Sequence, residues 1–372
     1  MKIRWVFIAF LLTGVQLLGS DNKFLFPRRY ITGVTYPFVL ADFDGDGKAD
    51  LVTARGNFIV FYHNPGDGNF GERISSPAPS TPYAIFSRDL NADGKRDLVW
   101  ISDTLNFMLG NGDGTFAPAT TTSEQAAFAA IADVNGDQKP DVVTVQIFTD
   151  GGEVFLGRGD GTFDLPLHYM STSNSLPWQV TAGDFNLDGK VDLAVCDTYG
   201  LAVVLGNGDG TFQAPTRYLA GFGPSLSIIS DDLNHDGILD LVTADFTGSE
   251  VSVLLGNGDG TFQASSQYAL RDWTWWTATG DFNGDHKRDV VIACSDNAVY
   301  RAAVQVLAGK GDGTFLLPAK SLPLPRKGTA QPTVVVTADL NGDGISDIAV
   351  GDTTFVTGIL VYLSNPGASA TE

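Results

Sequence analysis

Carboxylate and amide side chains recur at a fixed spacing in a nine-residue segment, and the clearest copy runs from Asp184 to Asp192. Oxygen-bearing side chains occupy positions 1, 3, 5 and 9 of this segment, and Gly189 occupies position 6. Oxygen ligands in a flexible loop favour Ca²⁺, and glycine permits the left-handed backbone that curls the loop around an ion. Position 12 is Val195, where an EF-hand needs a bidentate glutamate. The segment therefore predicts a calcium loop of another type.

Seven copies of this loop are present, and they begin 44 to 58 residues apart. We predict that each copy binds one Ca²⁺ ion, up to seven in all, with water and the position-7 carbonyl completing the coordination. The predicted ligands are the side chains at positions 1, 3, 5 and 9 of each copy, namely Asp42, Asp44, Asp46, Asp50, Asp89, Asn91, Asp93, Asp97, Asp133, Asn135, Asp137, Asp141, Asp184, Asn186, Asp188, Asp192, Asp232, Asn234, Asp236, Asp240, Asp281, Asn283, Asp285, Asp289, Asp339, Asn341, Asp343 and Asp347. We expect these ions to stabilise the fold, because acidic side chains from one short loop repel one another without a cation. A regulatory ion that also binds a partner is the alternative.

The loops belong to a repeated unit of about 50 residues, a period typical of propellers, solenoids and other arrays. Short apolar runs alternate with turn signals, and no stretch after residue 20 shows helical periodicity, so we expect an all-β fold. In the fourth repeat we expect strands over 179–183, 193–196 and 201–205, followed by an outer strand. The turn before that strand has the pattern Gly-x-Gly-Asp-Gly-Thr-Phe, and it recurs at 110–116, 157–163, 206–212, 256–262 and 309–315. The Arg-Gly-Asp tripeptide at 158–160 belongs to this turn, with arginine at its variable position.

The N-terminal segment 24–30 has the Phe-x-x-Pro-x-x-Tyr spacing of the outer strands at 163–169 and 212–218. The seventh repeat stops after its third strand, at 359–363. We therefore predict a ring of seven blades in which 24–30 supplies the outer strand of the last blade, so that no long sheet edge is open. Position 2 of every loop is apolar, which suits a side chain packed between adjacent blades. These residues are Phe43, Leu90, Val134, Phe185, Leu233, Phe282 and Leu340.

The net charge of −20 is concentrated in the loops, which hold 22 of the 43 acidic residues. Seven Ca²⁺ ions would reduce this charge to −6. The 23 basic residues are scattered, so the sequence does not indicate a nucleic-acid partner. Cys196 and Cys294 fall in repeats that are not neighbours in a ring, so we expect two buried thiols; a disulfide is the alternative.

Residues 1–20 have the pattern of a secretory signal, in which Lys2 and Arg4 precede an apolar run at 6–12. That run is too short for a spanning helix, although an uncleaved anchor is the alternative. We therefore predict a signal peptide at 1–20, a propeller at 21–367 and a tail at 368–372, with no membrane span after removal of the signal. The expected location is secreted, cell-surface or periplasmic, where roughly millimolar calcium fills weak sites.

The repeated Asp-Phe-Asn-x-Asp-Gly-Lys-x-Asp-Leu and Leu-Gly-Asn-Gly-Asp-Gly-Thr-Phe phrases resemble the VCBS/FG-GAP repeats, relatives of the propeller repeats in integrin α chains. The resemblance covers nearly the whole chain after residue 20. It implies a seven-bladed β-propeller with calcium in the loops between the first and second strands. Two loops depart from the pattern, because Gln138 and His286 replace the position-6 glycine. We expect their sites to be weaker or distorted.

Seven residues stand six positions before the loops and are expected to surround the mouth of the central channel, on the face opposite the loops: Tyr36, Tyr83, Ala127, Trp178, Leu226, Trp275 and Thr333. Tyr36, Tyr83, Trp178 and Trp275 are the predicted ligand-binding residues, because aromatic rings at a rim suit sugar stacking or a protein contact. The alternative is that they fill the channel. Five residues near turns on the same side could add polar contacts: Asp197, Tyr199, Asp245, Asp296 and Arg301.

The favoured function is a non-enzymatic binding or adhesion module, lectin-like, whose partner is carbohydrate or a cell-surface protein. The four histidines, His63, His168, His235 and His286, fall in different repeats and do not form a catalytic group with a nucleophile in the sequence. Pairs of acidic residues are present throughout the sequence, so they do not distinguish an enzyme from a binding module. A polysaccharide lyase or glycosidase with its site at the channel mouth is therefore the alternative.

Overall fold

The computed structural model describes residues 24, 28–30, 37–71, 73–146, 149, 151–170, 177–198, 200–220, 225–246, 248–270, 272–295, 302–322, 332–352 and 358–364. The predicted signal at 1–20 and the predicted tail at 368–372 lie outside these residues. Within the described part, the chain forms strands and turns and contains no α-helix. Accordingly, none of it is an apolar helix with the length to span a membrane.

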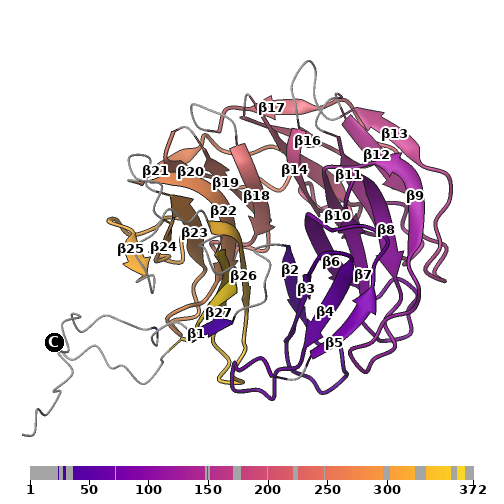
Figure 1. Ribbon diagram of the computed structural model, residues 1–372. Helices are drawn as coiled ribbons and strands as arrows, with labels where there is room; N and C mark the ends of the chain where they lie inside the picture. Colours follow the sequence, from indigo (N-terminus) through magenta and orange to yellow (C-terminus); the bar gives the residue numbers. More distant parts are fainter. Residues whose placement is uncertain are drawn as a thin grey trace, which may run out of the picture.

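Seven four-stranded antiparallel sheets form the blades of a ring, as Figure 1 shows. Blade 1 contains β2 (Phe38–Ala41), β3 (Asp50–Ala54), β4 (Phe58–Tyr62) and β5 (Arg73–Pro77). Blade 2 contains β6 (Ala84–Arg88), β7 (Asp97–Ile101), β8 (Thr104–Met108) and β9 (Thr120–Gln125). Blade 3 contains β10 (Phe128–Ala132), β11 (Asp141–Val145), β12 (Gly151–Phe155) and β13 (Leu167–Met170). Blade 4 contains β14 (Pro177–Gly183), β15 (Asp192–Asp197), β16 (Gly200–Val204) and β17 (Thr216–Tyr218). Blade 5 contains β18 (Ser225–Asp231), β19 (Asp240–Asp245), β20 (Glu250–Leu254) and β21 (Ser266–Ala269). Blade 6 contains β22 (Trp273–Gly280), β23 (Asp289–Ser295), β24 (Ala302–Leu307) and β25 (Lys320–Leu322). Blade 7 contains β26 (Pro332–Ala338), β27 (Asp347–Asp352), β28 (Gly358–Tyr362) and β1 (Arg28–Tyr30).

The first strand of the chain closes the ring, as the sequence predicts. β1 pairs antiparallel with β28, with Arg28 opposite Val361 and Tyr30 opposite Ile359. Phe24 extends the pairing through a bridge to Ser364. Figure 1 shows β1 beside the C-terminal blade. Without this strand, β28 would present an unpaired row of backbone N–H and C=O groups, so the N-terminal segment removes an edge that could otherwise pair with another chain.

The core lies between blades, and the position-2 residues of the loops are part of it, which confirms the prediction. All seven are at most 2% exposed. Phe43, for example, packs with Val52 of its own blade and with Leu98 and Trp100 of blade 2. Burial of one such side chain contributes roughly 1.5–3 kcal/mol relative to exposure. Each loop therefore also supplies an apolar side chain that joins its blade to the next.

A second contact between blades involves the residue that directly follows the third strand of a blade. In five repeats this residue is a leucine that packs against a glycine in the turn of the following blade. The pairs are Leu109 with Gly161, Leu156 with Gly210, Leu205 with Gly260, Leu255 with Gly313 and Leu363 with Gly68. A Cβ at Gly161 would lie 2.6 Å from a methyl carbon of Leu109, and Gly161 has φ of +80°, so glycine is required there for two reasons.

Removal of the closing strand should destabilise the whole ring. A chain that begins at residue 31 lacks β1 and leaves β28 unpaired, whereas a chain that begins at residue 24 retains β1 and the Phe24 bridge. We expect the shorter chain to melt at a lower temperature and to elute partly as dimers or larger species, because its open edge can pair between molecules. Thermal unfolding and size-exclusion chromatography of both chains measure this. Identical melting temperatures would show that the strand does not contribute to closure.

Candidate metal loops and channel mouth

Each predicted metal loop curls so that its side-chain oxygens face its own backbone. In the loop of blade 4, Asp184 accepts hydrogen bonds from the N–H groups of Asp188 and Gly189, at 3.2 and 2.8 Å. Asn186 accepts from Asp188 at 3.0 Å, and Asp188 accepts from Lys190 at 2.9 Å. These bonds direct the oxygens of positions 1, 3 and 5 toward the inside of one turn. Matching bonds from position 6 to position 1 occur in all seven loops.

Two residues in every loop have a left-handed backbone, at positions 4 and 6. The pair in the first loop is Gly45 and Gly47, with φ of 80° and 84°. Gln138 and His286 keep the same conformation at position 6, with φ of 66° and 61°, and their N–H groups still bond to the position-1 aspartate. The backbone of these two loops is therefore not rearranged, but it is strained. The strain at position 4 was not predicted, and it affects Ala92, Leu187 and His235.

The position-9 aspartate of every loop is buried, at most 1% exposed, and joins the loop to the turn that follows the third strand. In blade 4, Asp192 accepts the N–H of Phe185 at 2.9 Å on one oxygen and the N–H of Gly206 at 2.7 Å on the other. The same two bonds occur in the other six blades, with Asn64 and Ser364 in place of the glycine in blades 1 and 7. This predicted ligand is thus also a structural residue of each blade.

Burial changes the proton affinity of these carboxyl groups. It raises the pKa of Asp50, Asp240, Asp289 and Asp347 to about 6, although the backbone N–H bonds oppose the shift. Burial also raises the pKa of Asp97, Asp141 and Asp192. Neighbouring aspartates of the same loop raise the pKa further. The loops therefore hold negative charge at a cost that a bound cation would remove.

The donor set of the loops fits a hard cation. In the first loop, carboxylate oxygens of Asp42, Asp44 and Asp46 lie within 4.8 Å of one another. The predicted ligands of the other six loops are all carboxylate or amide oxygens, which are the ligands that Ca²⁺ prefers. A lysine at position 7 of five loops pairs with the position-5 aspartate, for example Lys48 with Asp46 at 3.2 Å. The spacing of the loop ligands in the sequence does not by itself indicate this role for the lysines.

The predicted aromatic positions lie at the opposite end of the inner strands from the loops. β14 runs from Pro177 to the start of the loop, a distance of roughly 20 Å at about 3.3 Å per residue. β-bulges occur at this end in blades 4, 5 and 6, and the extra residue is Trp178, Leu226 or Trp275. The bulge in blade 7 lies between Pro332 and Val335. A bulge changes the direction of a side chain, which sequence periodicity does not reveal.

The structure places three of the four predicted ligand-binding aromatics, and Tyr36 lies outside the described residues. Tyr83 is 38% exposed, and its hydroxyl donates to the carbonyl of Ala126, in the connection from blade 2 to blade 3. Trp178 and Trp275 are partly buried rather than fully buried. The indole N–H of Trp275 donates to Ser295 at 2.8 Å, whereas the buried indole nitrogen of Trp178 has no hydrogen-bond partner among the described residues.

An aromatic cluster surrounds Trp275, where the turn after β19 approaches the start of β22. The ring of Phe246 contacts Trp275 edge-on, with 4.6 Å between ring centroids, and lies 5.2 Å from Trp273. All three side chains are partly exposed. We call Phe246, Trp273 and Trp275 the mouth cluster.

A different aromatic pair fills part of the channel. Phe128 of blade 3 and Trp276 of blade 6 lie with their ring centroids 5.3 Å apart, although three steps around the ring separate their blades. They must therefore meet across the central channel. Phe128 and Trp276 each stand one position after a predicted mouth residue, Ala127 and Trp275, which leaves Trp275 beside the obstruction rather than part of it.

Two of the five predicted polar contacts at the mouth lie among the described residues, and neither takes that form. Asp197 and Asp245 are fully buried, and Asp197 pairs with Arg217 at 2.7 Å. Neither carboxylate is exposed to a ligand, because both lie at strand ends inside the sheet. Tyr199, Asp296 and Arg301 lie outside the described residues. Both cysteines are buried and free, as expected, and burial raises their pKa.

The fold and its loops define a seven-bladed β-propeller with an acidic loop after each inner strand. The sequence matches the FG-GAP-like repeat over residues 42–100, 89–144, 133–195, 184–243, 232–292 and 281–350. Every match begins at the position-1 aspartate of a loop. Since these matches cover most of the chain, the protein belongs to the FG-GAP-like repeat family. No curated protein sequence matches the chain.

Several solved structures share the fold. An Agrocybe aegerita lectin, described as recognising non-reducing terminal N-acetylglucosamine, is 21% identical, with a TM-score of 0.58, over 78% of this chain and 81% of that chain. BBS1N in complex with ARL6DN is 12% identical, with a TM-score of 0.63, over 93% of this chain and 98% of that chain. Raptor of Chaetomium thermophilum is 13% identical, with a TM-score of 0.56, over 92% of this chain and 30% of that chain. At these identities the similarity establishes the fold alone.

Glycine at the two irregular loop positions should stabilise the protein. Gln138→Gly and His286→Gly should each raise the free energy of unfolding by about 1 kcal/mol, because a left-handed non-glycine residue costs roughly 1–2 kcal/mol and the flexibility of glycine offsets part of the gain. Gly47→Ala is the matched control, since a Cβ there has nothing within 4 Å and only backbone strain is added. It should destabilise the protein by a similar amount. Urea unfolding measures the stability of all three variants. A loss of stability in both glycine variants would contradict backbone strain at Gln138 and His286.

Calcium should stabilise the protein more strongly as the pH rises. The folded-state pKa of about 6 for Asp50, Asp240, Asp289 and Asp347 lies above the ordinary value of 3.8. In the metal-free protein, the protonated carboxyl groups therefore contribute stability that is lost as the pH rises through 6. A cation binds the ionised loops, so the increase in melting temperature on adding Ca²⁺ should be small at about pH 5 and large at about pH 7.5. Equal melting temperatures with calcium and with a chelator at neutral pH would exclude a calcium role in folding.

Proposed function

We propose that this protein is an exported binding module, stabilised by calcium, that binds carbohydrate at the channel mouth. The observation that carries the proposal is the mouth cluster, in which three aromatic side chains remain partly exposed at the end of the ring opposite the acidic loops. Aromatic rings offer a large apolar face for stacking on a sugar and lose little side-chain entropy on binding.

The mouth cluster is held in place before any ligand binds. The hydrogen bond to Ser295 and the edge contact with Phe246 restrain the ring of Trp275, and the bulge sets its direction. Preorganisation of this kind raises affinity because fewer groups must be ordered on binding. Tyr83, on the far side of the ring in blade 2, is a second exposed aromatic at the same end.

Two further considerations support the proposal. The lectin among the structural neighbours shows that a propeller of this general shape is compatible with recognition of a sugar, although the shared feature is the fold. Up to seven Ca²⁺ ions in the loops would neutralise most of the acidic charge and join each loop to its blade, which is suited to the roughly millimolar calcium outside cells. In this scheme the ions stabilise the ring and the opposite face binds the ligand.

Truncation of the central tryptophan should weaken sugar binding without unfolding the ring. Trp275→Ala removes the ring that contacts Phe246, and we expect a loss of roughly five- to 150-fold in affinity for a retained glycan, because stacking contacts of this size contribute roughly 1–3 kcal/mol. Glycan-array retention followed by calorimetry on the retained sugar measures the effect. Leu165→Ala is the control, since Leu165 is 89% exposed outside the mouth.

The outcomes of that experiment separate the two candidate functions. Retention without shortened products supports a binding module, and loss of retention in Trp275→Ala with an unchanged melting temperature supports the mouth cluster as its site. Release of shortened sugars would instead show an enzyme. Retention that survives in Trp275→Ala would place the binding site elsewhere on the ring.

A further inference from the structure

The first metal loop differs from the other six in two places. Its position 3 is Asp44, whereas the other loops have asparagine there. The residue before its following turn is His63, where five other repeats have leucine and one has alanine. A carboxylate at position 3 and an imidazole before the following turn therefore occur only in the first repeat, and they occur there together.

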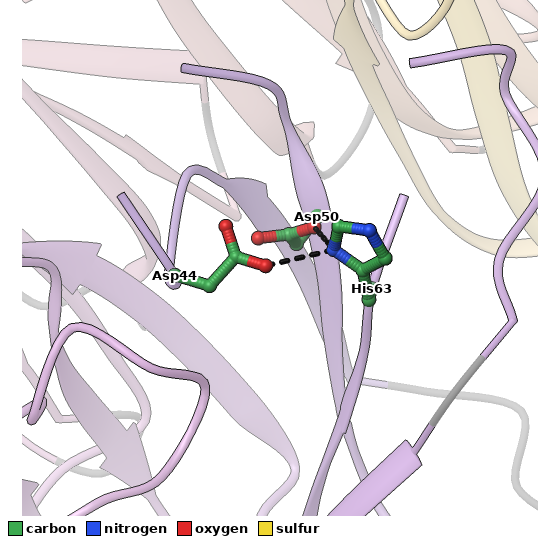
Figure 2. A group of neighbouring side chains, drawn as sticks. All are labelled: Asp44, Asp50 and His63. Carbon is green, nitrogen blue, oxygen red and sulfur yellow. Dashed lines mark hydrogen bonds and ion pairs between the residues drawn. The ribbon is translucent and has the colours of Figure 1, made fainter. Parts of the chain in front are cut away.

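The two exceptional side chains are in contact. The Nδ1 atom of His63 lies 2.7 Å from an oxygen of Asp44 and 3.6 Å from an oxygen of Asp50, the buried position-9 aspartate. Figure 2 shows both carboxylates directed at the imidazole. The three ligand atoms lie within 4.8 Å of one another. A nitrogen and two carboxylate groups thus converge on one point beside the loop.

His63 can turn toward the loop because another residue takes the packing role of this position. The leucines that precede the other turns pack against a glycine of the next blade. In blade 1 the corresponding glycine, Gly114, is covered by the ring of Phe61, two residues earlier in the chain. Phe61 is buried, whereas the side chain of His63 is 34% exposed. The interface between blades 1 and 2 is therefore filled without His63.

We propose that the loop of blade 1 is a transition-metal site, selective for Zn²⁺, in which Asp44, Asp50 and His63 are the ligands. Zinc binds imidazole nitrogen and carboxylate oxygen at about 2.0–2.2 Å, so a tetrahedral centre separates its ligand atoms by about 3.3 Å. The observed separations of 2.7 and 3.6 Å lie on either side of that value. Small side-chain shifts would bring Nδ1 of His63 and the oxygens of Asp44 and Asp50 to this separation.

The surroundings of the three ligands suit such a site. Backbone N–H groups of Phe43 and Asn64 fix the carboxylate of Asp50, and supporting hydrogen bonds of this kind orient metal ligands. Asp44 is held by the N–H of Asp46 at 3.2 Å. The side chains of His63 and Asp44 are 34% and 19% exposed, so the fourth position of the metal is open to water. An imidazole ligand favours zinc over calcium, which prefers oxygen.

The zinc site and the predicted calcium loop share two residues, Asp44 and Asp50. Asp44 also belongs to the group of carboxylates that it forms with Asp42 and Asp46. Zinc at His63 therefore competes with calcium in blade 1 and leaves the other six loops unaffected. The proposal does not depend on the calcium or carbohydrate roles above, because it rests on His63, which belongs to neither, and concerns a different metal.

Zinc binding in the presence of excess calcium tests the proposal. The full-length mature protein, freed of metal and then saturated with Ca²⁺, is titrated with Zn²⁺ by calorimetry, and the bound metal is counted after dialysis. We expect one zinc ion per chain. Titration with Co²⁺ should give the intense visible absorption of a four-coordinate site. Calcium content measured on the same samples reports separately on the six ordinary loops, so failure of the calcium role and failure of the zinc site are distinguishable.

Substitutions to the residues of the other repeats identify the ligands. His63→Leu and Asp44→Asn should each weaken zinc binding at least tenfold while the melting temperature in calcium changes little. His286→Gly is the matched control, since it removes an imidazole beside a different loop, 3.8 Å from Asp281, and should retain the zinc. If His63→Leu fails to fold, Asp44→Asn decides the question. Absence of zinc binding in the native protein, or its retention in Asp44→Asn, would overturn the proposal.

Discussion

The ring depends on the hydrogen bonds that the buried carboxylate at position 9 of each loop accepts. This carboxylate accepts one N–H from its own loop and one from the turn after the third strand, and this arrangement is present in all seven blades. Removal of one partner from a buried hydrogen bond costs roughly 1–3 kcal/mol. In blade 7 the bonded turn residue is Ser364, which also pairs with Phe24, so this carboxylate is linked directly to the closure of the ring.

Much of the fold was predictable because it follows from repetition. The strand order within a blade, the closing N-terminal strand and the burial of Phe43 and its equivalents follow from a motif written seven times and from one strand missing at the end of the chain. The left-handed conformation at position 4 was not predictable from glycine content, since Ala92, Leu187 and His235 adopt it. There the fixed hydrogen bonds of the loop override the local backbone preference.

The site was predictable only in part, because a consensus emphasises what the copies share. The repeat spacing placed Tyr83, Trp178 and Trp275 at the entry of the inner strand, but the bulges at Trp178 and Trp275 arise from one extra residue in the pairing, which leaves no signal in composition. The contact of Asp44 with His63 depends on differences between one copy and the rest. Asp197 and Asp245 were expected at the surface, but their strands extend far enough to bury them.

The contact between Phe128 and Trp276 has a mechanical consequence. Because the two rings meet along a diameter, the propeller resists becoming oval along the line through blades 3 and 6. The axis at this level is occupied by side chains, so the centre of the ring does not act as a conduit there. Distortion of blade 6 by a load on its rim would be transmitted straight to blade 3, without passing through the blades between them.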